Sequence, residues 1–268
     1  MLIYIRGGGD LSSGVAYRLH KCGYNLIISE LPQPVPVRRT VSFASAIYQK
    51  EISIEGLTGI LTTDINNIPQ LLLAKMIPVI IDPEGATLPI VKPDVIVDGR
   101  MLKQVVDLPV FKPALLVGLG PGFTAGINCD AVVETNRGPF LGRVYWNGQA
   151  EEDTGIPEPV NHFSSERVIR SPGDGVFTAD KSIGDQVKKQ EIVGYVNQMP
   201  VFAPIEGIVR GLIMDGLQVY NHMKIGDIDP RMDRRLLHQV SDKSLAICGG
   251  VLEAILTKFH DNFLTVVY

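Results

Sequence analysis

The stretch that decides the fold is Leu2-Ile3-Tyr4-Ile5-Arg6-Gly7-Gly8-Gly9-Asp10-Leu11. It opens with a short apolar run, typical of a buried strand, and three glycines then break that run. From Leu11 to Cys22 apolar residues recur at a helical period, and Gly23 follows at a C-cap position. Asn25 to Ser29 has the pattern of a second strand. The order strand, glycine turn, helix, strand predicts an α/β fold with parallel strands.

The same alternation continues to about residue 130. The further elements that it predicts are a helix over residues 67–76 and short apolar strands over residues 78–81, 94–97 and 114–117. Short apolar strands that alternate with helices are typical of a mainly parallel sheet. We therefore predict a Rossmann-like N-terminal α/β domain over residues 1–130, followed by a connecting segment over residues 131–165.

An internal repeat indicates a different fold from residue 166 onward. Ser171-Pro172-Gly173-Asp174-Gly175-Val176 resembles Ala203-Pro204-Ile205-Glu206-Gly207-Ile208 at an offset of 32 residues, 203 minus 171. In the same register Gly184 meets Gly216 and Val187 meets Val219. Two halves with one strand pattern predict an all-β unit over residues 166–232 with a pseudo-twofold axis. Apolar residues at helical spacing return within residues 233–268, which are predicted as a C-terminal helical segment. Packing of this segment on the first domain is one possible arrangement.

The first half of this unit is similar to biotinyl and lipoyl carrier domains. Gly184-Asp185-x-Val187, followed by Ile192 to Val196, carries that similarity and predicts a barrel-sandwich hybrid fold. Carrier domains attach their cofactor to a lysine on the hairpin between the halves. Counting from Gly184 places Pro200 there, and proline has no amine to acylate. No covalent biotin or lipoate is therefore expected, and a docking or dimerising module is the alternative role.

The first candidate ligand-binding segment is the glycine turn after the first strand. Gly7 and Gly9 allow backbone amides to approach a phosphate at a helix N-terminus. Glu30 ends the second strand, where a ribose-binding acid is expected. Two residues depart from the dinucleotide pattern, because Ser12 replaces the third glycine and Asp10 would repel a phosphate. The alternative is that these are ordinary turn residues, with Asp10 as a helix cap.

A second glycine-rich loop follows the strand predicted at residues 114–117. Successive amides in such a loop can form an anion-binding nest at the edge where α/β sheets bind ligands. The alternative is a structural crossover into the β unit. Arginines can neutralise an anion with forked contacts, although such residues more often lie on a solvated face. The further candidate residues are Gly118, Gly120, Gly122, Thr124, Arg38, Arg39 and Arg137.

Composition excludes several classes of function. A formal net charge of −4 argues against broad nucleic-acid binding. Three widely spaced cysteines argue against a disulfide framework. The histidines and cysteines show no metal-ligand spacing, so no metal site is expected. No signal peptide or membrane span is expected either, which makes the cytoplasm the predicted compartment.

Several longer motifs resemble one family, the YqeB-type accessory proteins of the selenium-dependent molybdenum hydroxylase system. The motifs are Ile5-Arg6-Gly7-Gly8-Gly9-Asp10-Leu11, Val37-Arg38-Arg39-Thr40-Val41-Ser42-Phe43, residues 118–126, Val133-Glu134-Thr135-Asn136-Arg137-Gly138 and Lys224-Ile225-Gly226-Asp227-Ile228-Asp229-Pro230. The resemblance implies a bacterial cytoplasmic factor that helps to mature a molybdenum hydroxylase carrying labile selenium. It implies the apo-hydroxylase as a partner and supplies no catalytic residue. One departure is Pro139, where a histidine is expected.

Two functions of different classes remain open at this point. The first is a maturation factor whose α/β domain binds a nucleotide or a cofactor fragment. The second is a nucleotide- or nicotinamide-dependent enzyme in selenium or molybdenum-cofactor chemistry. The sequence shows no nucleophile with an adjacent base, which favours the first function. A small anion or nucleotide is the expected ligand in both cases, and a homo-oligomer is left open.

Overall fold

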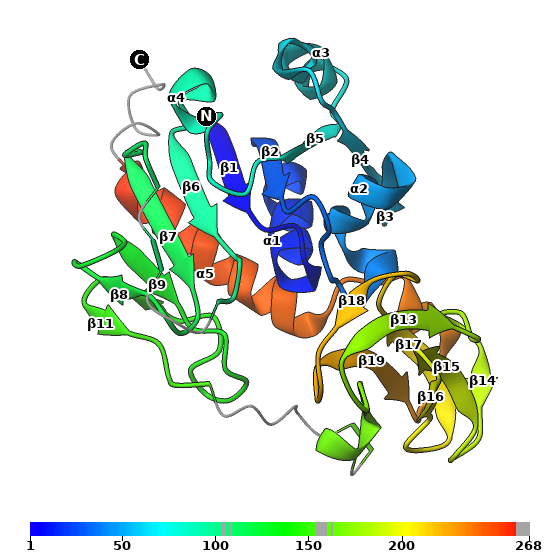
Figure 1. Cartoon of the computed structure of the whole chain (residues 1–268). Coiled ribbons are helices and arrows are strands. Elements are labelled where there is room, and N and C mark those ends of the chain that lie inside the picture. Colours follow the sequence, from blue (N-terminus) through cyan, green and yellow to red (C-terminus); the bar gives the residue numbers. More distant parts are fainter. Residues whose placement is uncertain (103–105, 108, 154–159, 162, 261–268) are drawn as a thin grey trace.

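The computed structural model describes residues 1–102, 106–107, 109–153, 160–161 and 163–260. Its larger part is built around one extended β-sheet, and a smaller β module lies beside it (Figure 1). Helices α1 (Asp10–Lys21) and α5 (Asp242–Lys258) pack together in the larger part. Within the described residues, no helix is long and apolar enough to cross a membrane.

The large sheet has nine strands in the order β10-β9-β7-β6-β1-β2-β5-β4-β3. Neighbours run parallel from β9 through β4, whereas the edge strands β10 and β3 run antiparallel to their neighbours. Its strands are β1 (Leu2–Arg6), β2 (Asn25–Glu30), β3 (Glu51–Ile54), β4 (Leu57–Leu61), β5 (Ile77–Ile81), β6 (Val95–Asp98), β7 (Leu115–Leu119), β9 (Ala131–Val133) and β10 (Val144–Tyr145). A short ladder beside it joins β8 (Thr124–Ala125) to β11 (Gly148–Gln149).

The two faces of this sheet are covered differently. Ile3 and Ile5 of β1 point to the face on which α1 and α5 pack, and they belong to the larger core. Tyr4, between them, points to the opposite face. That face is covered by the short helices α3 (Ile68–Leu73) and α4 (Leu88–Val91) and by loop residues. A fourth short helix, α2 (Ala46–Gln49), follows the loop after β2.

The predicted fold class is wrong. The expectation was a Rossmann-like sheet within residues 1–130 followed by a biotinyl/lipoyl-like domain. The structure instead has a mixed nine-stranded sheet that includes β9 and β10, beyond residue 130, and is closed on one face by the C-terminal helix α5. The physical reason is that α5 supplies the apolar cover that a local crossover helix supplies in a doubly wound sheet.

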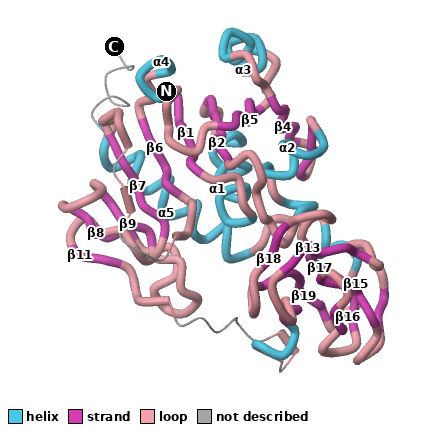
Figure 2. Tube along the Cα trace, in the orientation of Figure 1, coloured by secondary structure: helices cyan, strands magenta, loops and turns pink. Residues whose placement is uncertain are grey.

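The β module contains two four-stranded sheets, ordered β12-β19-β17-β14 and β16-β15-β13-β18. Its strands are β12 (Val168–Arg170), β13 (Gly175–Ala179), β14 (Gln186–Val187), β15 (Ile192–Val196), β16 (Met199–Phe202), β17 (Gly207–Leu212), β18 (Gln218–Val219) and β19 (Lys224–Asp229). Figure 2 shows this module as strands and loops, with the long helices in the larger part.

The predicted repeat is confirmed by the way the strands of the module pair. β14 of the first half pairs with β17 of the second, and β18 of the second half pairs with β13 of the first. Gly184 and Gly216 occupy equivalent turns before β14 and β18, and both have positive φ, 102° and 80°. The two halves therefore exchange strands, which buries apolar surface that neither half could cover alone.

Segment 37–39 attaches the β module to the larger part. The amide of Leu212 donates to the carbonyl of Val37 over 2.8 Å, and Nε of Arg39 donates to the carbonyl of Leu212 over 2.7 Å. The predicted connecting segment includes residues 154–159 and 162, and the predicted C-terminal segment includes residues 261–268. These residues lie outside those that the structure describes.

Candidate functional site

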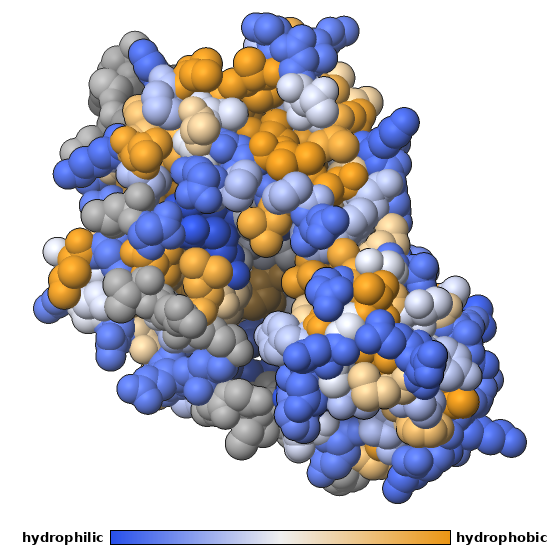
Figure 3. Space-filling model, viewed as in Figure 1, coloured by the Kyte–Doolittle hydropathy of each residue, from blue (hydrophilic) through white to orange (hydrophobic). Residues whose placement is uncertain are grey.

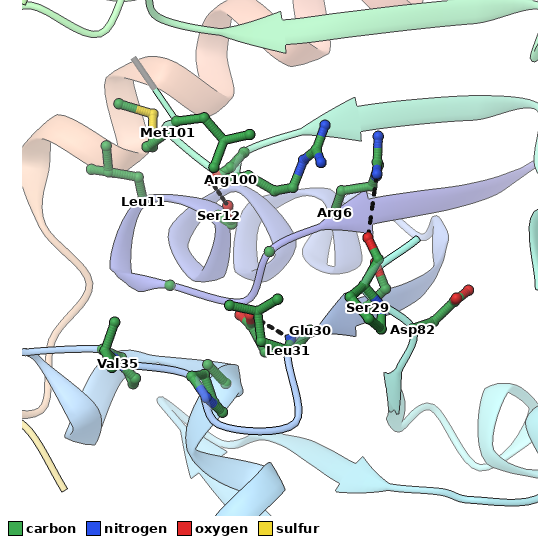
Figure 4. Close-up of a pocket in the computed structure, with 18 of the residues that line it drawn as sticks. Arg6, Leu11, Ser12, Ser29, Glu30, Leu31, Val35, Asp82, Arg100 and Met101 are labelled. Carbon is green, nitrogen blue, oxygen red and sulfur yellow. Dashed lines mark hydrogen bonds between the residues drawn. The ribbon is translucent and has the colours of Figure 1, made fainter. Parts of the chain in front are cut away.

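A pocket of about 490 Å³ lies at the carboxyl ends of β1, β2, β5 and β6. Because parallel strands end at the same edge of a sheet, the loops after these four strands converge there (Figure 4). The surface is hollowed between the larger part and the β module in the same view as Figure 1 (Figure 3). The pocket is lined by Arg6, Gly7, Gly9, Asp10, Leu11, Ser12, Ser29, Glu30, Leu31, Pro34, Val35, Pro36, Ala44, Asp82, Pro83, Glu84, Gly99, Arg100, Met101, Leu102 and Asp107.

The N-terminus of α1 opens into this pocket. Gly9 is the N-cap with an extended backbone, and no side chain caps the helix. The first turn closes when the amide of Ser13 donates to the carbonyl of Gly9 over 2.8 Å. Among the described residues, the amides of Asp10, Leu11 and Ser12 have no acceptor. Free amides at the positive end of a helix dipole favour a negatively charged ligand group.

Glu30 is fixed by two backbone amides at the pocket wall. Its Oε2 accepts from Gly8 over 2.6 Å, and its Oε1 accepts from Leu31 over 2.8 Å. Burial raises the pKa of the Glu30 carboxyl above its usual value, and the two amides oppose that shift. The carboxylate is therefore held rigidly where β2 ends, and each oxygen retains a lone pair for a further donor.

Two arginines and two aspartates form a charged network on the β1–β6 side of the pocket. Arg6 is 1% exposed and forms ion pairs with Asp98 over 3.2 Å and with Asp107 over 3.5 Å. Arg100 pairs with the same carboxylates over 2.8 and 2.9 Å. Nε of Arg6 is buried and has no acceptor among the described residues. The guanidinium of Arg6 therefore retains one buried donor that no described residue uses.

On the β5 side of the pocket, the carboxylate of Asp82 is held by hydrogen bonds from the protein. It accepts from the hydroxyl of Tyr4 over 2.8 Å and from the amides of Ala86 and Thr87 over 2.7 and 2.9 Å. Burial opposes the charge of Asp82, but the hydrogen bonds from Thr87, Tyr4 and Ala86 together outweigh it and lower the pKa of the carboxyl. Asp82 is thus ionised and anchors the turn into α4.

The structure brings four of the predicted site residues to the pocket, Gly7, Gly9, Asp10 and Glu30. Arg38 lies behind them and is occupied by protein groups. Its Nη1 contacts both oxygens of Asp10 over 3.1 and 3.2 Å, and its Nη2 donates to the carbonyls of Leu236 and Gln239. The charge of Asp10, which sequence reasoning counted against a phosphate, is therefore offset by Arg38.

The second glycine loop does not line this pocket, because β6 separates β7 from β1 in the sheet. Gly118 packs against the ring of Phe123, and the amide of Gly120 donates to the carbonyl of Val133 over 2.9 Å. Asn128 holds the next turn, because its side chain accepts from the amide of Thr124 and donates to the carbonyl of Gly122. The amides of Gly120 and Thr124 are therefore occupied by acceptors of the protein, in β9 and in the following turn.

The two remaining predicted arginines also lie away from the pocket. Arg39 spans the junction with the β module, where Nε contacts the carbonyl of Leu212. Arg137 forms two hydrogen bonds to Asp242 in the first turn of α5, over 2.6 and 2.8 Å. Neither side chain can neutralise a ligand charge in the pocket from these positions.

Sequence reasoning missed Arg6, Asp82 and Arg100 as pocket residues. A usable signal was present, since each follows or ends a predicted strand of the parallel sheet. Arg6 ends β1, Asp82 follows β5, and Arg100 comes two residues after β6. Charged residues at the carboxyl ends of adjacent parallel strands meet at one edge.

The chain is similar to one curated protein, and no family model matches it. It is 42% identical over 261 residues to the uncharacterized protein YqeB of Escherichia coli strain K12. The match covers 97% of this chain and 48% of YqeB, so the chain spans about half the length of that relative. The predicted resemblance to YqeB-type proteins is confirmed as similarity of sequence.

Two solved structures are distant neighbours. An aspartoacylase family protein from Mesorhizobium loti aligns over 85% of this chain and 84% of its own, with 11% identity and a TM-score of 0.28. The ectoine utilization protein EutE from Ruegeria pomeroyi aligns over 76% of this chain and 57% of its own, with 12% identity and a TM-score of 0.22. Likeness at this level carries no argument about activity.

Proposed function

We propose that this chain binds a nucleotide-type ligand in the pocket at the carboxyl ends of β1, β2, β5 and β6. One observation carries the proposal. Three amides at the N-terminus of α1 lack acceptors among the described residues, and they face a pocket that the carboxylate of Glu30 also lines. A phosphate suits the amides, and ribose hydroxyls suit the carboxylate of Glu30.

The charge of the pocket limits where a phosphate can bind. Five carboxylates line it, those of Asp10, Glu30, Asp82, Glu84 and Asp107, against the guanidinium groups of Arg6 and Arg100. Among the described residues, the region that favours an anion is the start of α1, where Arg38 offsets Asp10. Away from it, the carboxylates favour groups that donate hydrogen bonds, such as hydroxyls and amines. A nucleoside with a short phosphate chain fits this division better than an inorganic anion.

The resemblance to the selenium-dependent molybdenum hydroxylase system gives the ligand a context. We infer that the chain acts as an accessory factor that helps to mature such a hydroxylase. The ligand would be a fragment of the cofactor of that hydroxylase, or a nucleotide whose binding reports that the cofactor is present. Reconstitution of the apo-hydroxylase tests this role. The proposal requires that active, selenium-loaded hydroxylase accumulates faster with the chain than without it, and it fails if the two time courses coincide.

A thermal-shift screen tests the ligand. NAD, NADP, ATP, GTP, CTP and molybdopterin nucleotides are the probes, and a ligand at 100 times its Kd adds about 2.7 kcal/mol of stability. Two variants of matched size then locate the site, Gly9→Asp and Gly9→Asn. Gly9 has φ −67° and open space where a Cβ would stand. Both new side chains can cap the helix by accepting from one of its free amides, so both variants should bind the hit more weakly than wild type. Only the aspartate adds a negative charge, so Gly9→Asp should bind the hit at least about tenfold more weakly than Gly9→Asn.

A further inference from the structure

A cluster of charged side chains lies on β17 and β19 of the β module, outside the pocket. It contains the segment Lys224-Ile225-Gly226-Asp227-Ile228-Asp229, which the sequence analysis singled out and the proposed function does not use. We call it the β17–β19 cluster. Its members are Arg167, Arg210, Lys224, Asp227, Asp229 and Arg231.

Two irregularities in the strand pairing place this cluster on one face. Ile225 and Ile228 both point into the core of the β module, although they are three residues apart. A register shift opposite Ile169 and Arg170 accounts for that spacing. Lys224 and Asp227, each adjacent to one of those isoleucines, therefore face away from the core.

Arg210 lies at the second irregularity, between β17 and β19. Val209 pairs with Ile228 and Gly211 pairs with Asp227, so Arg210 is the residue left without an opposite partner. Such bulges redirect a side chain, and they are over-represented next to functional sites. The bulge turns Arg210 toward the carboxylates of β19, Asp227 at 3.5 Å and Asp229 at 3.8 Å.

Both carboxylates are already held by other arginines. Arg167 forms a close ion pair with Asp227, and Arg231 binds Asp229 through two hydrogen bonds of 2.6 and 2.9 Å. Arg210 has only the two long ion pairs, and no hydrogen bond joins it to any described residue. Its side chain is 15% exposed, and its buried Nε has no hydrogen-bond acceptor among the described residues. A guanidinium so far removed from water normally binds acceptors.

Lys224 adds a further positive charge to the same place. No ion pair or hydrogen bond joins its ammonium to another described residue, and its side chain is accessible to solvent. Desolvation of the ammonium lowers the pKa of Lys224, and the positive charges of Arg167 and Arg210 lower it further. Asp227 and Asp10 oppose that shift. Unlike Arg167 and Arg231, Arg210 and Lys224 thus have no hydrogen-bonded acceptor among the described residues.

We propose that Arg210 and Lys224 form a binding site for an oxyanion of the phosphate class on the β17–β19 cluster. The guanidinium of Arg210 and the ammonium of Lys224 supply the contacts, and Asp227 and Asp229 orient Arg210. Asp10 connects the two sites electrostatically, because it lines the pocket and its charge also acts on Lys224. The oxyanion is therefore either free phosphate or a distal phosphate of a ligand that also enters the pocket.

Calorimetric titration of the full chain with inorganic phosphate tests the site at low ionic strength. Wild type should show saturable binding of one phosphate, and Lys224→Gln and Arg210→Gln should each weaken it by about tenfold. Lys189→Gln is the matched control, because it removes an exposed lysine elsewhere in the module and should leave the affinity unchanged. Since Lys224 is accessible, its variant should fold even if Arg210→Gln does not.

Gly9→Asp separates this site from the pocket, and Lys224→Gln identifies the source of the oxyanion. Inorganic phosphate should bind Gly9→Asp as it binds wild type, whatever the fate of the pocket ligand. If Lys224→Gln also weakens the nucleotide found by the screen, the oxyanion is that ligand's distal phosphate; if it weakens inorganic phosphate alone, the source is free phosphate. The proposal is overturned if wild type binds no phosphate, or if Lys224→Gln and Lys189→Gln bind phosphate equally.

Discussion

The amide of Gly8 donates a 2.6 Å hydrogen bond to Oε2 of Glu30, which joins the glycine turn after β1 to the end of β2. This bond is a direct link between two of the elements that sequence reasoning assigned to a ligand site. This single hydrogen bond gives the amide of Gly8 an acceptor and also fixes the half-buried carboxylate of Glu30. The pocket wall is consequently ordered before any ligand arrives, which lowers the entropic cost of binding.

Replacing Glu30 with glutamine should change how stability depends on pH. Burial raises the pKa of Glu30 in the folded state above the usual 4.5, so folding favours the protonated form. The stability that protonation contributes is present below pH 4.5 and is lost as pH rises through the raised folded value. Glutamine does not titrate. The unfolding free energy of Glu30→Gln relative to wild type should therefore increase as pH rises from 4.5.

Chemical denaturation at a series of pH values measures this difference. Glu253→Gln, which changes an exposed glutamate on α5, is the control and should follow wild type throughout. A relative stability of Glu30→Gln that stays constant between about pH 4 and about pH 8 would show that the Gly8 and Leu31 amides cancel the effect of burial.

Gly120→Ala should destabilise the protein without changing the pocket. Gly120 has φ +73°, and a Cβ there would clash with the hydroxyl of Thr135. Gly126→Ala is a matched control in the same loop, with φ +84° and open space where a Cβ would stand. The left-handed conformation alone costs about 1–2 kcal/mol. Gly120→Ala should exceed that loss, Gly126→Ala should match it, and nucleotide affinity should be unchanged in both.

Much of the local structure was predictable from apolar periodicity. The run from Leu2 to Ile5 and the spacing from Leu11 onward became β1 and α1 with boundaries within a residue or two. The helix after residue 241 was found for the same reason. Such elements bury one face, so their pattern is visible in the sequence.

The sheet as a whole was not predictable in this way. The hairpin of β3 (Glu51–Ile54) and β4 (Leu57–Leu61) places an antiparallel strand at one edge, and two-residue β10 places another at the opposite edge. β10, with two residues, is too short to give a periodic signal. The packing of α5 on a sheet that lies far earlier in the chain depends on shape, such as the close approach of Gly14 and Ser244.

Only one of the two glycine loops predicted to bind a ligand lies at the pocket. Gly9 and Glu30 could be placed together because one strand, one turn and one helix connect them. The loop around Gly120 looked equivalent from its glycines, but the amides of Gly120 and Thr124 already donate to Val133 and Asn128. The number of glycines does not reveal whether amides are free. That depends on partners such as Asn128, whose role appears only in three dimensions.

The ion pair between Arg137 and Asp242 should contribute a small, pH-dependent stability. Hydrogen bonds from Arg137 lower the pKa of Asp242 to about 2 in the folded state, against 3.8 unperturbed. The stabilisation is therefore present above pH 3.8 and is lost as pH falls through about 2. Because the Asp242 side chain is 75% exposed, solvent screening limits the effect of Asp242→Asn to less than about 1 kcal/mol.

A double-mutant cycle with Arg137→Gln isolates this pair by denaturation at about pH 7. The coupling energy should be positive but below about 1 kcal/mol, and it should fall when salt is added. A coupling of several kcal/mol would mean that the start of α5 depends on this pair far more than its exposure allows.

Thiol labelling should distinguish the three cysteines. Cys22 is exposed at the end of α1, whereas Cys129 and Cys248 are buried. Burial raises the pKa of the Cys129 and Cys248 thiols to about 12, so almost no thiolate is present at about pH 8. The native protein should react with one equivalent of an aromatic disulfide reagent, and the denatured protein with three. Cys22→Ser should abolish the native reaction and leave two thiols after denaturation. Rapid native labelling of Cys248 would contradict its position in the core between α1 and α5, where its Sγ lies 3.4 Å from the carbonyl of Val15.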